Sequence, residues 1–136
     1  MLTLAEIYYR NVYEVALSTT STFNFSLQNY KTNTFFETKF AIITAGNPNN
    51  IDLPSEENRA RNRELYSRLN SSALLNVRGC YLEHCEDGYL IYNIALEAAL
   101  VLGREYEQVA IFYNDSKNLM YVDCKSESVI SERAVD

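Results

Sequence analysis

Amide and guanidinium side chains gather where one apolar segment ends and a helical segment begins. The apolar segment ends in Thr44-Ala-Gly-Asn47-Pro, and residues 55–69 then have the pattern of a helix. At 100° per residue, one face of that helix carries three polar residues, Asn58, Arg61 and Asn62. Amides both donate and accept hydrogen bonds, and a guanidinium clamps a carboxylate or a phosphate. The spacing therefore predicts a polar binding site between the strand end and the helix start.

The same side chains also have a purely structural interpretation. Asn47 precedes a proline, as turn residues often do, and Asn58 and Asn62 could tie the loop to the helix. Glu57 and Arg61 are four residues apart, the spacing of an ion pair within a helix. Polar groups on a core-facing side of a helix cost free energy unless they have partners. The sequence leaves open whether these partners are a ligand or the protein itself.

Two further residues complete the candidate site. Glu83 ends a predicted strand and is the only plausible general base, although the sequence does not decide whether any reaction is catalysed. Its neighbour His84 would point to the opposite face of that strand. Gln108 lies where the last helix passes into a strand, within reach of the site or of the helix-end carbonyls. The predicted ligand-binding residues are therefore Thr44, Asn47, Asn58, Arg61, Asn62, Glu83 and Gln108.

The cysteines and the single histidine do not have the spacing of a metal site. Cys80, Cys85 and Cys124 form no CxxC pair, so we expect no metal and no cofactor. An odd number of cysteines without a secretion signal predicts free thiols in a reducing cytoplasm. The sequence thus predicts a cytoplasmic protein.

Charge and composition restrict the partner. A net charge of −6 at pH 7 makes nucleic acid an unlikely partner, and no apolar run is long enough to span a membrane. The partner is then an unidentified small molecule, polar or anionic and nucleotide-like, bound around Asn47 and Asn58. The alternative is a protein–protein interaction module, an inhibitor or regulator without catalytic activity, which eleven Tyr and an acidic surface would suit. The oligomeric state cannot be inferred.

Hairpins mixed with helices must position these residues. A capping-box spacing from Thr3 to Glu6 predicts a short N-terminal helix, and the two main helices are predicted at 55–69 and 94–105. Strands are predicted at residues 12–17, 22–27, 35–45, 74–83, 89–92, 108–113 and 119–124, with a tight turn at 86–88. This order predicts an α+β fold with a mixed, largely antiparallel sheet. We expect one globular domain over residues 1–125 and a mobile tail over 126–136.

Four short motifs follow one another along the chain: Thr44-Ala-Gly-Asn-Pro, Ser55-x-x-Asn-x-x-x-Asn-x-x-Leu65, a lone Glu83, and Gln108-Val-Ala-Ile-Phe. Their order, over roughly residues 5 to 122, resembles a family of small bacterial single-domain proteins of unknown function. The resemblance implies importance for the predicted site residues other than Arg61, and for Pro48, but no reaction. Glu107 stands where that family commonly has Gly, which implies a helix end with a non-glycine residue in the left-handed conformation.

Overall fold

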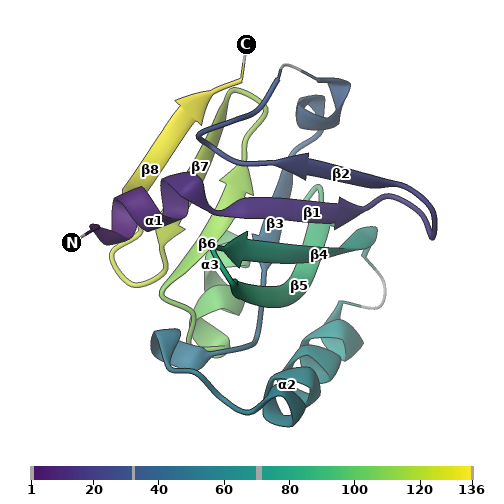
Figure 1. Ribbon diagram of the computed structural model, residues 1–136, viewed down its shortest axis with the longest axis vertical. Helices are drawn as coiled ribbons and strands as arrows, with labels where there is room; N and C mark the ends of the chain where they lie inside the picture. The colour runs from purple at the N-terminus through teal and green to yellow at the C-terminus, as the bar shows by residue number, and fades with distance from the viewer. Residues whose placement is uncertain (1, 32, 70–71, 136) are drawn as a thin grey trace.

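Eight strands form one curled sheet in the order β2-β1-β4-β5-β3-β6-β7-β8 (Figure 1). The structure, a computed structural model, describes residues 2–31, 33–69 and 72–135. The strands are β1 (Val12–Ala16), β2 (Thr22–Phe25), β3 (Phe40–Ile43), β4 (Leu74–Tyr81), β5 (His84–Tyr92), β6 (Ala110–Asn114), β7 (Asn118–Asp123) and β8 (Val129–Ala134). The helices are α1 (Leu4–Arg10), α2 (Ser55–Arg68) and α3 (Leu96–Glu105), with short 3₁₀ segments at Thr34–Glu37 and Pro48–Asn50.

The predicted α+β class is confirmed. Three α-helices accompany the sheet in the described part of the chain, and the short N-terminal helix starts with the expected Thr3–Glu6 capping box. All the pairings between the described strands are antiparallel, whereas we expected a mixed, largely antiparallel sheet. No helix within the described ranges has the length and apolar character that crossing a bilayer requires.

The sheet separates two hydrophobic cores. Residues Phe40 and Ile42 of β3 face an aromatic core, while Ala41 and Ile43 face a helix core that contains Leu65 of α2 and residues of α3. All four β3 residues are buried, which is why this strand has a continuous apolar run instead of alternating residues. The central strand is thereby held from both sides.

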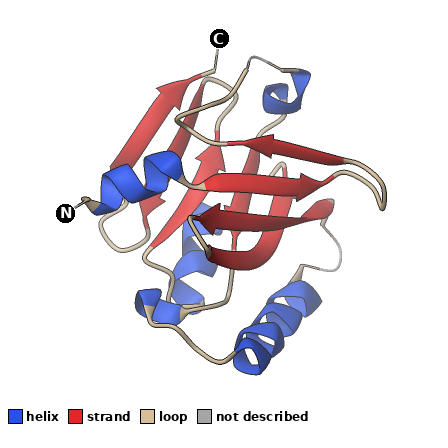
Figure 2. Ribbon diagram, in the orientation of Figure 1, coloured by secondary structure: helices blue, strands red, loops and turns tan. Residues whose placement is uncertain are grey.

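The sheet coils so strongly that β1 and β2 cross the direction of β7 and β8, with α1 in front of it and α3 behind (Figures 1 and 2). On β8, the guanidinium of Arg133 donates to the carbonyl of Leu27 at 2.8 Å and lies 4.9 Å from the ring centre of Tyr30. The two edges of the sheet are thus linked around the aromatic core, which lies on the concave side.

The β4–β5 hairpin turns earlier than expected. The turn is Leu82–Glu83 instead of residues 86–88, so β5 begins at His84. Leu82 has a φ of 55° and is 79% exposed. Directly behind the turn, Cys80 and Cys85 face each other across the two strands and form a disulfide.

The expectation of three free thiols is therefore wrong, because among the cysteines only Cys124 is free, and it is buried. The predicted cytoplasmic location rested partly on those thiols, and it stays a prediction. No signal in the spacing of Cys80 and Cys85 distinguishes a cross-strand disulfide from two separate thiols, because the pairing depends on where the hairpin turns.

Part of the segment expected to be a mobile tail is a strand. Residues 129–134 form β8, which pairs with β7, and Ile130 and Val135 pack against the aromatic core. The sequence of β8 does not show the regular alternation of apolar and polar residues, because β8 is an edge strand whose residues are mostly exposed. Residue 136 lies outside the described residues, and the single domain over 1–125 stays a prediction.

The left-handed helix end implied by the family resemblance is confirmed. Glu107 has a φ of 59°, and the next amide, that of Gln108, donates to the carbonyl of Gly103 at 2.8 Å. We predict that Glu107→Gly raises the free energy of unfolding by about 1 kcal/mol, since glycine adopts this conformation without a Cβ clash. Urea denaturation measures the change.

Glu107→Ala is the matched control. It keeps a Cβ in the left-handed conformation and removes the carboxylate that lies 3.7 Å from Arg61. The alanine variant should therefore gain no stability. A glycine variant no more stable than the alanine variant would contradict the proposed backbone cost.

Candidate functional site

The loop after β3 runs through three residues in the left-handed conformation. Asn47, Asn49 and Asn50 have φ values of 44°, 55° and 59°. Asparagine tolerates this region better than other non-glycine residues, which explains why the loop reads Asn-Pro-Asn-Asn. Its conformation turns backbone groups away from any strand, so they need other partners.

Side chains of α2 supply those partners. The Asn58 amide accepts from the backbone N–H of Asn47 at 2.9 Å and donates to the Asn47 side-chain oxygen at 2.8 Å. The Asn62 amide accepts from the N–H of Ala45 at 2.9 Å and donates to the carbonyl of Asp87 at 3.0 Å. Both amides thus use donor and acceptor within the protein.

Arg61 and Gln108 bind the carbonyls of the same region. The Arg61 guanidinium donates to the carbonyls of Ala45 and Tyr106, the latter at 2.8 Å. The Gln108 amide donates to the carbonyl of Gly46 at 2.9 Å and to that of Tyr106 at 3.1 Å. We call the set Asn47, Asn58, Arg61, Asn62 and Gln108 the loop tie. These predicted residues do converge, but mainly on backbone groups and on each other.

A pocket of about 580 Å³ lies beside the loop tie, on the concave side of the sheet. Four predicted site residues line it: Thr44, Asn47, Asn58 and Gln108. A smaller hollow of about 170 Å³ shares Asn47 and Asn58 with the pocket and adds Asn62 and Arg59. The amide pair of Asn47 and Asn58 therefore forms a wall common to both spaces.

Glu83 and Arg61 have other positions. Glu83, which we expected on a strand facing the site, is exposed in the turn between β4 and β5. Arg61 contacts backbone carbonyls and lies 3.7 Å from the carboxylate of Glu107. Its guanidinium is thus engaged within the protein, not directed at the pocket.

Glu86 is the acidic residue that the sequence analysis missed. Because the hairpin turns at Leu82–Glu83, Glu86 lies within β5 and lines the pocket. Its Oε1 accepts from the Asn47 side chain at 2.9 Å, and no described residue donates to its Oε2. Burial raises the pKa of Glu86, the Asn47 hydrogen bond lowers it less, and the charge of Asp52 raises it further.

Three tyrosines that line the pocket lie side by side, and we call them its aromatic floor. The rings of Tyr8, on α1, and Tyr121, on β7, stack with their centres 4.6 Å apart, and the Tyr121 hydroxyl accepts from the Asn11 amide at 3.2 Å. Tyr13 lies next to them, 5.2 Å from the ring of Phe112. Burial raises the pKa values of Tyr13 and Tyr121, so both hydroxyls stay protonated near neutral pH.

The charged lining of the pocket is acidic. Glu86 and Asp52 line it together with His84, and the described lining residues include no Lys or Arg. The described residues also contain no group of three His, Cys, Asp or Glu side chains able to hold a metal ion. The pocket therefore offers aromatic surface, amides and carboxylates.

The hydrogen bonds of the loop tie lead to a prediction about Asn58. We predict that Asn58→Ala lowers the free energy of unfolding by about 1–3 kcal/mol, because the partly buried N–H of Asn47 loses its acceptor. Arg63→Ala, on the exposed side of the same helix, should change stability by less than about 0.5 kcal/mol. Equal effects of the two variants in chemical denaturation would refute the structural role of Asn58.

The raised pKa of Glu86 leads to a prediction about how stability depends on pH. The folded protein keeps the Glu86 proton at pH values where the unfolded chain has lost it. Ionisation of this group therefore lowers the free energy of unfolding as pH rises from about 4.3, the unfolded value, through the raised folded pKa. Glu86→Gln, which cannot ionise, should gain stability relative to the unaltered protein over that range, as measured by urea denaturation.

Asp52→Asn tests one of the causes. Removing this negative charge should lower the pKa of Glu86, which a carbon-13 NMR titration of the Glu86 carboxyl measures directly. An unchanged titration curve would show that Asp52 does not act on Glu86.

Comparisons with known proteins identify a family and no activity. A family model described as "Protein of unknown function (DUF3293)" matches residues 43–111, slightly more than half of the chain. The matched segment contains the whole loop tie and Glu86. A search of curated proteins and a search of solved structures each found no match. The predicted membership of an uncharacterised family is thus confirmed: the chain belongs to DUF3293, a family of proteins of unknown function.

Proposed function

We propose that the protein binds a small organic molecule in the concave pocket, with a flat apolar part against the tyrosines and a hydrogen-bond donor at Glu86. The observation that carries this proposal is the position of Glu86. Its carboxylate is partly buried in a pocket of about 580 Å³, and its Oε2 lacks a donor among the described residues. The volume of this pocket lies in the range of small-molecule sites, and its lining combines aromatic and polar side chains.

The chemistry of the lining favours a neutral or cationic ligand. Two carboxylates and no Lys or Arg among the described lining residues would repel a phosphate or carboxylate group. A nucleobase, nucleoside or aromatic amine would donate to Glu86 and stack on the aromatic floor. Of the nucleotide-like ligand that the sequence suggested, the base thus fits the pocket better than the phosphates do.

The loop tie has a supporting role in this proposal. Asn47 donates to Glu86 and so orients the carboxylate, while Asn58 holds Asn47. If the pocket catalyses a proton transfer, Glu86 is the candidate general base, since Glu83 is exposed in the turn. Arg61 and Asn62 then serve the site by holding the loop.

The alternative function, a protein interaction module, receives less support. Of the eleven tyrosines, only Tyr9 and Tyr66 are exposed, and the others are partly or fully buried. Tyrosines therefore mainly fill the cores and the pocket floor, and the residue type that suggested an interface is used elsewhere.

A thermal-shift screen tests the proposal. The panel contains nucleobases, nucleosides and aromatic amines, with aromatic carboxylates and nucleotides of matching size. We expect members of the first group to raise the melting temperature and the carboxylates to have no effect. Glu86→Gln should weaken the binding of the best amine at least about tenfold, the loss of one hydrogen bond to a charged group.

Two alanine positions provide a matched pair of variants. Ala110, on β6, lines the pocket, so Ala110→Phe should fill it and abolish binding. Ala98→Phe places the same ring on the exposed side of α3 and should leave binding unchanged. A ligand that binds equally well to both variants would place the binding site elsewhere.

A further inference from the structure

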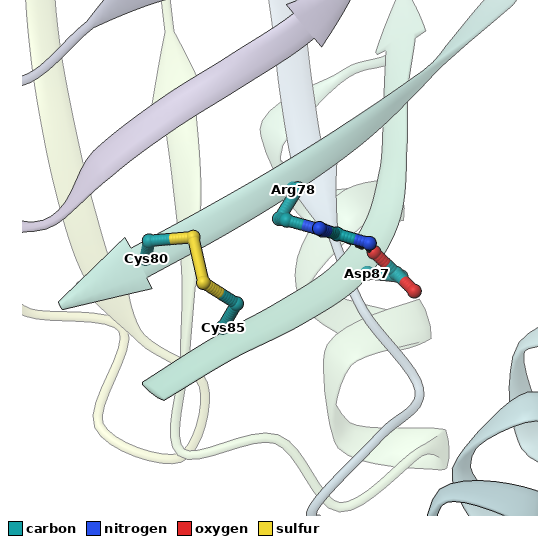
Figure 3. Close-up of a disulfide and its surroundings, with 4 residues drawn as sticks. All are labelled: Arg78, Cys80, Cys85 and Asp87. Carbon is teal, nitrogen blue, oxygen red and sulfur yellow. Dashed lines mark hydrogen bonds and ion pairs between the residues drawn. A yellow bond between two sulfur atoms is a disulfide. The ribbon is translucent and has the colours of Figure 1, made fainter. Parts of the chain in front are cut away.

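A disulfide links the two strands of the β4–β5 hairpin, which forms one wall of the pocket. Cys80 on β4 and Cys85 on β5 are directly opposite each other, and the next pair on the same face is the exposed ion pair of Arg78 and Asp87 (Figure 3). Cys85 is exposed and Cys80 is partly buried. The disulfide is thus accessible to a thiol from solution, as exchange requires.

The turn beyond the disulfide is conformationally unfavourable. It contains only Leu82 and Glu83, and Leu82 adopts a φ of 55°, a region that short hairpin turns usually fill with Gly, Asn or Asp. Leu82 is also an apolar residue exposed to solvent. The disulfide therefore holds together a turn whose own sequence does not favour it.

The other face of the same hairpin belongs to the pocket. Side chains alternate along a strand, so Cys85 and Asp87 point to one face while His84 and Glu86 point to the other. Tyr81, His84 and Glu86 line the pocket, and Cys85 of the disulfide itself lines it as well. A loosened hairpin end would move Glu86, the group on which the proposed ligand depends.

We propose that the Cys80–Cys85 disulfide is a thiol–disulfide exchange site, and that its reduction loosens the hairpin end and weakens ligand binding in the pocket. The effect on binding rests on the proposed function, whereas the exchange and the loosening do not. The buried Cys124 does not compete, since burial raises the pKa of its thiol to about 11.

The reaction partner is a low-molecular-weight thiol. Its thiolate attacks Sγ of Cys85, the more exposed sulfur, and the Cys80–Cys85 bond breaks as a mixed disulfide forms on Cys85. Cys80 leaves as a thiolate and takes up a proton. A second thiolate attacks the sulfur of the bound thiol, which releases the small-molecule disulfide and leaves Cys85 as a thiol. Two small-molecule thiols are oxidised and one protein disulfide is reduced. The same steps in reverse form the Cys80–Cys85 disulfide again.

The first experiment uses dithiothreitol on the folded protein, followed by maleimide labelling and mass spectrometry. We expect Cys80 and Cys85 to become labelled without denaturant while Cys124 stays unlabelled. Reduction that occurs only after unfolding, with Cys124 labelled at the same time, would overturn the exchange site.

The second experiment measures amide hydrogen exchange with and without dithiothreitol. We expect at least a tenfold faster exchange in residues 79–87 after reduction and no change in α3. The double variant Cys80→Ser/Cys85→Ser should reproduce the reduced state. Unchanged exchange in 79–87 would overturn the proposed loosening.

Leu82→Gly tests whether the turn causes the loosening. Glycine adopts this positive φ without a steric cost, so reduction of the variant should increase amide hydrogen exchange in residues 79–87 less. Ser116→Gly is the matched control, because Ser116 also has a positive φ, 74°, but lies in the β6–β7 turn. It should leave the hairpin unchanged, and an equal effect of both variants would refute this cause.

Ligand binding provides the last readout. The best compound from the screen should bind the reduced protein several times more weakly than the oxidised protein, and equal affinity would overturn the link to the pocket. If no compound binds either form, the proposed function fails, and labelling and hydrogen exchange still decide the exchange site and the loosening.

Discussion

Buried backbone groups need hydrogen-bond partners, and the loop after the central strand depends on this requirement more than any other part of the molecule. Residues 44–50 leave the sheet in conformations that no neighbouring strand can pair. Asn58 and Asn62 of α2 supply the hydrogen bonds that a neighbouring strand would otherwise make. Gln108, just before β6, supplies another. The position of α2, the direction of the loop and one wall of the pocket all follow from these bonds.

The sequence predicts this cluster well because amides on a core-facing side of a helix are costly without partners. The sequence does not reveal what those partners are, because an amide oxygen accepts equally well from a backbone N–H and from a ligand donor. The structure assigns both Asn58 and Asn62 to backbone groups and to another amide. Glu86 is a neighbour of the cluster and not a member of the predicted set, and its Oε2 has no donor among the described residues.

Glu86 was missed for a local reason. Glu86-Asp87-Gly88 has the composition of a tight turn, and Leu82-Glu83 does not, so turn preferences favour the wrong hairpin. Pairing between β4 and β5 and the disulfide outweigh those preferences. In the observed register Gly88 fits closely against β3, where a Cβ would lie 2.6 Å from the carbonyl oxygen of Ile43. The glycine is thus needed for strand contact and not for a turn, a distinction that composition alone does not reveal. The strand β8 was missed because an edge strand carries little apolar pattern.

The pocket is built from two parts of the chain, one inside and one outside the segment that the family model matches. Its polar rim, with Asn47, Asn58 and Glu86, lies within the matched residues 43–111, whereas Tyr8, Tyr13 and Tyr121 of its floor lie outside them. Substitutions in the floor would therefore leave intact the hydrogen bonds that hold the loop. In the proposed ligand site, changes in α1, β1 and β7 would alter the apolar surface offered to a guest while its polar contacts stay the same.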